Sequence, residues 1–147
     1  MKQLFLITAL LALNFLHAEE RVILHLLDPE GSPVAGKQFW IDWNDEWMAV
    51  AEKKEIRSIE AKEIINLLAA MLLPDEATHF CGHSPVYGIE AFRADGVELR
   101  TSLCFDCLTW VQPNKRMSIS GELGLSNLLC VQLQKHIELK VEASNSE

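Results

Sequence analysis

The dipeptide Asp95-Gly96 is the feature that most constrains how this chain can fold. Both central positions of a type I′ turn require a positive φ, and Asp and Gly tolerate it, so the pair predicts a two-residue hairpin turn. Such a turn also sets how the flanking strands pair. We expect Arg93 to lie opposite Glu98 as a cross-strand ion pair, and Phe92 to lie opposite Leu99. The chain must therefore contain antiparallel sheet.

Two segments have the apolar periodicity of helices. Ser58 is a good N-cap, and apolar residues recur after it at helical spacing until Pro74 ends the pattern. The second half of this segment is apolar nearly all round, which predicts that the helix Ser58–Leu73 is buried at the centre of the fold. A second amphipathic segment begins near Gly121 and predicts a C-terminal helix.

The N-terminal third has the patterns of β-strands. Arg21–Leu27 is rich in β-branched and leucine residues, and the turn-forming cluster Asp28–Pro33 separates it from the alternating segment Lys37–Trp43. Glu46–Ile56 fits either a third strand or a loop. Together with the hairpin at Asp95-Gly96, these segments predict an α+β fold. Its antiparallel sheet of hairpins packs against two helices, in the order ββ(β)αββα.

The first eighteen residues are typical of a signal peptide. Lys2 gives a positive start, Leu4–Leu13 is an almost unbroken apolar run, and Ala18 supplies a small residue at the cleavage site. A membrane anchor needs about eighteen or more apolar residues, and this run is too short for one. We therefore expect cleavage after residue 18 and a periplasmic or secreted protein.

Composition indicates what kind of protein remains after cleavage. Removing residues 1–18, which hold one Lys and no acid, leaves 129 residues and changes the formal net charge from −8 to −9. That length predicts one α+β domain over residues 19–142 and a polar, disordered tail over residues 143–147. The acidic balance argues against nucleic acid or anionic lipid as a partner. The longest remaining apolar stretch, Ile64–Leu73, is too short to span a membrane.

Four cysteines carry the chemistry that is most open to interpretation: Cys81, Cys104, Cys107 and Cys130. An even number in an exported chain indicates up to two disulfides, with three possible connectivities. Residues three apart in an extended strand lie about 10 Å apart, beyond the roughly 7 Å limit for a disulfide. Cys104 therefore pairs with Cys107 only if the chain turns between them. If the strand stays extended, Cys81 is the natural partner of one of the two, and Cys130 is free or is the second partner.

The same region also fits a metal site. Cys81 and His83 precede the predicted hairpin and Cys104 and Cys107 follow it, which offers three thiolates and one imidazole to tetrahedral zinc. An oxidising compartment opposes this interpretation, because thiols oxidise there unless a metal binds them first. A third interpretation is thiol–disulfide exchange at Cys104 and Cys107, although no helix N-terminus is evident there to lower a thiol pKa.

One part of the sequence combines the residues Phe80-Cys81-Gly82, Pro85, Gly88, Cys104-Phe105 and Cys107. This pattern resembles one in a family of uncharacterised exported bacterial proteins, and the resemblance covers about a third of the chain. It implies an exported protein and draws attention to the cysteines, but the family has no established activity. Family members often have a His near the position of Tyr87, and its absence here argues against a His ligand at that position.

Trp40 and Trp47 are candidate ligand-binding residues. They lie in a segment that is rich in tryptophan and carboxylates, which is the composition of a sugar-stacking surface. Core packing is the competing explanation. The alternation of this segment predicts that Phe39, Ile41 and Trp43 are buried, which leaves only Trp40 and Trp47 exposed.

Conventional catalytic motifs are missing from the sequence, which has no nucleophile elbow, no phosphate-binding glycine loop and no His-Glu-x-x-His motif. His25 lies in a predicted strand and His136 on a predicted helix face, so we interpret both as structural or surface residues. We therefore expect a non-enzymatic binding or structural protein with a cysteine-stabilised hairpin and an unknown protein or small-molecule partner. The alternatives are a zinc-binding protein and a redox protein.

Overall fold

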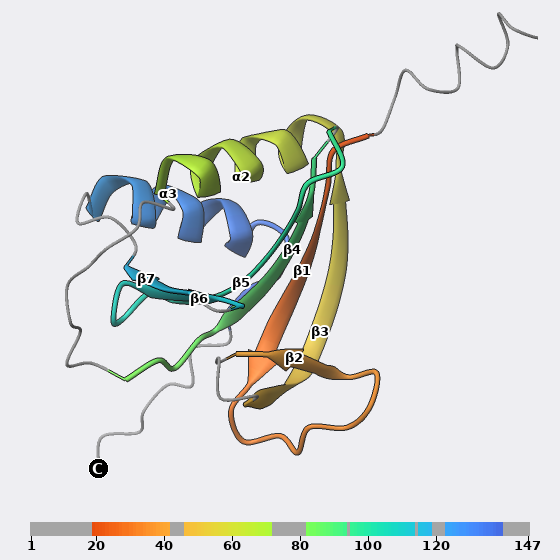
Figure 1. Cartoon of the computed structure of the whole chain (residues 1–147), viewed down its shortest axis with the longest axis vertical. Coiled ribbons are helices and arrows are strands. Elements are labelled where there is room, and N and C mark those ends of the chain that lie inside the picture. The colour runs from red at the N-terminus through yellow and green to blue at the C-terminus, as the bar shows by residue number, and fades with distance from the viewer. Residues whose placement is uncertain are drawn as a thin grey trace, which may run out of the picture.

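The structure is a computed structural model of the whole chain (Figure 1). It describes residues 19–41, 46–71, 82–93, 95–113, 115–118 and 123–139. The predicted signal segment and the predicted C-terminal tail lie outside these ranges, so both stay predictions. No helix within the described ranges has the length and apolar character needed to cross a membrane.

The described strands form one antiparallel sheet of seven, which confirms the predicted α+β class. The strands lie in the order β2-β3-β1-β4-β5-β6-β7. In the sequence they are β1 Arg21–Asp28, β2 Gln38–Trp40, β3 Trp47–Arg57, β4 Tyr87–Phe92, β5 Glu98–Cys104, β6 Thr109–Gln112 and β7 Lys115–Ser118. The third N-terminal strand, which the sequence left open, is β3. The strands β6 and β7 are additions to the predicted order.

Two helices cover one face of the curled sheet (Figure 1). They are α2, Ser58–Met71, which begins at the predicted residue, and α3, Leu123–Gln134. The inward side of α2 is buried, as its periodicity predicted, and it belongs to a core that also contains apolar residues of five strands and of α3. The Tyr87 hydroxyl, buried in this core, donates a hydrogen bond of 2.7 Å to the carbonyl of Ile137. The helix-covered face is therefore a sealed apolar core whose buried phenol has a partner.

The hairpin of β4 and β5 forms at the predicted place but in a different register. Arg93 N donates to Val97 O at 3.2 Å and Gly96 N donates to Arg93 O at 2.9 Å, so three residues separate the paired strands instead of two. Gly96 has a φ of +82°, as in a type I turn closed by a left-handed residue. The predicted pairing of Arg93 with Glu98 is therefore wrong.

This shift of one residue changes which side chains meet across the hairpin. Phe92 lies opposite Glu98, and Glu90 lies opposite Arg100. In the predicted register Glu90 would have faced Thr101. Because the side-chain period of a strand is two, the observed register places Glu90 and Arg100 together on the sheet face away from the helices, here called the open face.

The N-terminal hairpin of β2 and β3 folds over part of the open face. Leu26 pairs with Glu52 and Leu27 with Val50, so Ala51 is an extra residue in β3, and such a bulge bends its strand. A small second apolar cluster forms here, with the buried residues Leu27, Phe39 and Ile41. The bend lets β2 cross the end of β1 (Figure 1). One part of the open face is thus covered, and the part beside it is hollow.

Candidate functional site

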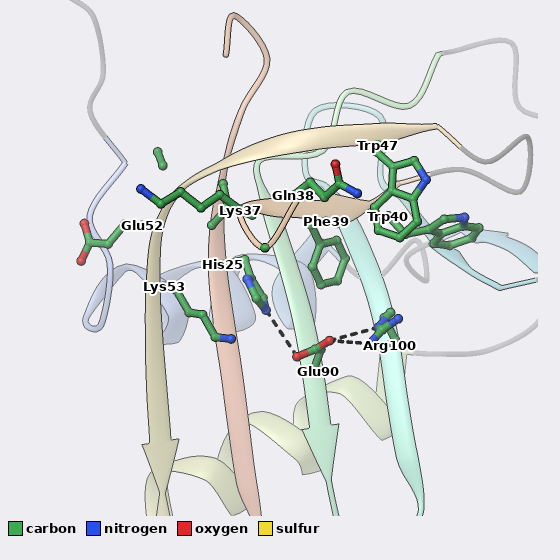
Figure 2. Close-up of a pocket in the computed structure, with 13 residues that line it drawn as sticks. His25, Lys37, Gln38, Phe39, Trp40, Trp47, Glu52, Lys53, Glu90 and Arg100 are labelled. Atoms are coloured by element: carbon green, nitrogen blue, oxygen red, sulfur yellow. Dashed lines mark hydrogen bonds and ion pairs between the residues drawn. The ribbon is translucent and has the colours of Figure 1, made fainter. Parts of the chain in front are cut away.

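A cavity of about 440 Å³ lies between β2 and the open face (Figure 2). We call it the His25 cavity. Five strands and the loop before β2 line it, with the residues His25, Gly36, Lys37, Gln38, Phe39, Trp40, Trp47, Val50, Ala51, Glu52, Lys53, Glu90 and Arg100. The helices lie behind the sheet, so none of their residues reaches it.

Gly88 determines how closely β2 approaches the sheet. A Cβ added to Gly88 would lie 2.6 Å from Cδ1 of Phe39, which is closer than any normal contact. The Phe39 ring therefore rests on bare backbone, and its centroid is 4.8 Å from that of the His25 ring. This close approach explains why a glycine stands inside β4.

Four polar side chains cross the floor of the cavity, one from each of four neighbouring strands. His25 on β1 pairs with Lys53 on β3, and Glu90 on β4 pairs with Arg100 on β5. Arg100 donates to one Glu90 oxygen from Nη2 at 2.6 Å and from Nε at 3.1 Å. The other Glu90 oxygen lies 3.5 Å from Nε2 of His25 (Figure 2). The Glu90 carboxylate therefore lies between the His25 imidazole and the Arg100 guanidinium and interacts with both.

His25 is the unusual member of this row. Only 8% of its side-chain surface is exposed, and neither ring nitrogen has a hydrogen-bond partner among the described residues. Burial lowers the pKa of His25, the Glu90 carboxylate opposes this shift, and Lys53 adds to it. The imidazole is therefore neutral at pH 7. A buried polar group without a partner costs about 1–3 kcal/mol, which natural proteins tolerate mainly at functional sites.

The two tryptophans that the sequence suggested for ligand binding both line this cavity. Trp40 and Trp47 are cross-strand neighbours on β2 and β3. Trp47 is 43% exposed, as predicted, whereas Trp40 is only 8% exposed and the prediction that it is exposed is wrong. Phe39 and Ile41 are buried as predicted, and Trp43 lies outside the described residues. Consecutive side chains of this segment are buried, so both faces of β2 are covered, which simple alternation does not anticipate.

The cysteines lie elsewhere, at the β5–β6 turn and on α3. Cys104 is a free thiol, 1% exposed, and its Sγ accepts a hydrogen bond of 3.4 Å from Cys107 N. Cys107 is not a free thiol. Cys130 is free, and its pKa is raised by burial. Cys81 lies outside the described residues. The chain does turn between Cys104 and Cys107, yet Cys104 stays free.

His83, the proposed fourth zinc ligand, hydrogen-bonds through both ring nitrogens. Its Nδ1 lies 2.9 Å from Thr109 Oγ1 and its Nε2 lies 2.8 Å from Ser102 Oγ. Ser102 donates its own proton to the carbonyl of Ile41 at 3.2 Å, so Nε2 of His83 is the donor to Ser102. No group of three potential metal ligands occurs among the described residues. Because Cys81 is not among them, zinc binding stays a prediction.

Four residues of the cavity floor were not predicted from the sequence as site residues: His25, Lys53, Glu90 and Arg100. A usable signal was present, because His25 and Glu90 are ionisable residues inside otherwise apolar strands. Such positions are rarely ionisable without a partner or a role. What the sequence lacked was the register that brings the two side chains together.

Comparison of the chain with protein-family models, with curated proteins and with solved structures finds no match. The resemblance to exported bacterial proteins therefore stays a prediction, and the site has to be interpreted from its own geometry.

Proposed function

We propose that this protein is a non-enzymatic binding protein and that the His25 cavity holds a small ligand. One observation carries this proposal: a buried His25, whose ring nitrogens make no hydrogen bond to a described residue and whose nearest ionic neighbour is the Glu90 carboxylate at 3.5 Å, lies in the floor of a cavity that has the half-exposed Trp47 in its wall. Ligand sites typically combine an apolar or aromatic wall with a few polar groups that converge. No Ser, Thr or Cys side chain lines this cavity among the described residues, so it offers no hydroxyl or thiol for covalent catalysis, and binding is the simpler role.

The test is a ligand screen by saturation-transfer NMR, with a library of monosaccharides and small aromatic acids, amides and amines. We expect ligands that bind the wild type at millimolar concentration and lose binding in Trp47→Ala. The control is Val131→Ala, because Val131 is a comparably exposed apolar residue on α3, which does not line the cavity. The proposal fails if no compound binds, or if Trp47→Ala binds the same compounds as the wild type does.

We also propose that the cysteine-stabilised hairpin is closed by a disulfide between Cys81 and Cys107. The support is that Cys104 and Cys130 are free thiols whereas Cys107 is not. Such a bond persists in an oxidising compartment, in agreement with the proposed periplasmic or secreted location. In the purified protein we expect alkylation of two thiols after denaturation without reductant, and of four after reduction. Alkylation of four thiols without reductant, or stoichiometric zinc in the native mass, would instead support the metal alternative.

A further inference from the structure

The charges around the His25 cavity do not balance. Five of its lining residues carry formal charges: Lys37, Glu52, Lys53, Glu90 and Arg100. Glu90 and Arg100 neutralise each other through the contact of 2.6 Å. Figure 2 shows Lys53 extending over the floor beside His25, whereas the Glu52 carboxylate and the Lys37 ammonium lie away from the floor, on the outer side of β3. The floor therefore keeps one positive charge in excess.

Lys53 is the source of this excess. It has no ion-pair partner among the described residues, although arginines nearby on the sheet pair with Glu55, Glu90 and Glu98. The next residue, Lys54, lies on the other face of β3, where its Nζ donates to the carbonyl of His136 at 3.2 Å. Apart from the paired Glu90 and Arg100, the described part of the cavity floor offers Lys53 no negative charge, so the Lys53 ammonium attracts an anion from solution. Cavity walls of low dielectric constant strengthen this attraction.

The walls determine what kind of anion fits. The upper wall is aromatic, formed by Phe39, Trp40 and Trp47 (Figure 2). Aromatic side chains of this kind stack on flat apolar faces, which both aromatic rings and sugar rings present. We propose that the His25 cavity selects a small organic acid, whose carboxylate lies over His25 between Lys53 and Arg100 and whose flat ring packs toward Trp47. This inference rests on the proposed function, because it names the ligand of the same cavity.

His25 gives the inference a second, independent signature. A carboxylate placed above His25 adds negative charge beside a neutral imidazole that already has Glu90 on one side. The charged groups that face His25 are Glu90 from β4, Lys53 from β3 and Arg100 from β5, and Phe39 covers it from β2. The bound anion offsets the effect of burial and of the two cations, so the imidazole takes up a proton on binding. Affinity for the acid should therefore rise as the pH falls.

The experiment compares matched acids and neutral analogues by isothermal titration calorimetry. The probes are indole-3-acetate against indole-3-acetamide, and glucuronate against glucose. The first pair tests an acid with an aromatic ring, and the second pair tests an acid with a sugar ring. We expect at least one acid to bind about tenfold more tightly than its neutral analogue, and Lys53→Gln to remove that preference. Lys54→Gln is the matched control, and it should leave both affinities unchanged.

The pH arm uses the acid that binds best. From pH 7.5 to pH 6.0 its affinity for the wild type should rise about threefold or more, with proton uptake seen as a dependence of the measured heat on the buffer. His25→Gln should remove this pH dependence of the affinity, whereas Lys53→Gln should keep part of it.

The inference is overturned if acids and neutral analogues bind equally, or if Lys54→Gln weakens binding of the acid as much as Lys53→Gln does. Neutral ligands that bind and are lost in Trp47→Ala would still leave the proposed function standing. Absence of any binding would remove both.

Discussion

The two faces of the sheet are built by opposite rules. On the helix-covered face the large buried residues are apolar, the buried phenol donates to a carbonyl, and the small hydroxyl of Ser126 on α3 is the one buried polar group without a hydrogen bond in the described part of the two helices. On the open face the apolar cluster is small, and beside it lies a buried His25 without a hydrogen-bond partner in the described part of the chain. The first face maximises apolar burial, and the second retains a large ionisable group without a hydrogen bond from any described residue.

This difference separates the source of stability from the place of function. Burial of large apolar side chains against two helices gives the larger part of the folding free energy. A covered but unsatisfied imidazole lowers stability, and a protein keeps such a group where binding requires it. Substitutions on the two faces should therefore have different consequences, and four of them test the contrast in order of decreasing effect.

The largest effect is expected on the helix-covered face, for Leu68→Asp. Leu68 is 1% exposed in the main core, and an unpaired carboxylate there costs more than a domain of this size can lose. We expect no cooperative unfolding transition by circular dichroism. Ala69→Asp, one residue later on the exposed side of α2, should still melt cooperatively. A melt of Leu68→Asp near the wild-type temperature would show that this face is not the stability centre.

The next effect concerns the contact between β2 and the open face, for Gly88→Ala. The added methyl group would lie 2.6 Å from the Phe39 ring, so the ring has to move, at a cost of about 1–3 kcal/mol in the free energy of unfolding. Urea denaturation measures this loss. Gly82→Ala is the control, because nothing lies within 4 Å of the added Cβ there. If Gly88→Ala is as stable as Gly82→Ala, β2 does not rest on the sheet as described.

The third effect is a pH dependence that comes from His25. Its folded-state pKa is lowered from 6.5, first by burial, so the unfolded chain binds the proton more readily. Titration of His25 therefore leaves the free energy of unfolding unchanged above pH 6.5 and decreases it as the pH falls from 6.5 toward the folded pKa. The urea midpoint should fall between pH 7.5 and pH 5.5, and it should fall less in His25→Gln. Burial also lowers the pKa of His136. Its titration changes the urea midpoint in the same direction in the wild type and in His25→Gln, so it does not affect the comparison.

The smallest effect is expected for Lys53→Gln in the absence of ligand. Lys53 is exposed and has no ion-pair partner among the described residues, so its charge adds little to folding, and the free energy of unfolding should change by about 0.5 kcal/mol or less. Urea denaturation at neutral pH provides the measurement. A loss of several kcal/mol would mean that Lys53 holds the fold together, and the contrast between the two faces would then be weaker.

Local signals predicted much of the fold because the physics behind them is local. The helix begins at Ser58 and buries its apolar side as the 3.6-residue period requires, and Arg21–Asp28 forms the first strand. The hairpin at Asp95-Gly96 exists as predicted, but only Gly96 has the positive φ that was expected of both residues, so the turn is not of type I′. The register failed because two-residue and three-residue turns use the same residue types, and only the pairing of whole strands decides between them.

The candidate site shows the same division. Trp47 was found from composition, since exposed aromatic residues near polar groups are typical of ligand sites. Lys53, His25, Glu90 and Arg100 were not found, because they come from four strands whose order in the sheet is not the order of the sequence. A single residue of slip in the β4–β5 register would have separated Glu90 from Arg100.

The sequence by itself determined the class of fold, the position of α2 and the existence of the central hairpin, because turn chemistry and hydrophobic period act over a few neighbouring residues. The tertiary structure decided where the polar residues meet. The bulge at Ala51, the bare backbone at Gly88 and the three-residue turn each determine the position of one element, and together they produce the cavity and its charged floor. Such contacts between distant residues depend on packing of the whole sheet, and no local pattern encodes them.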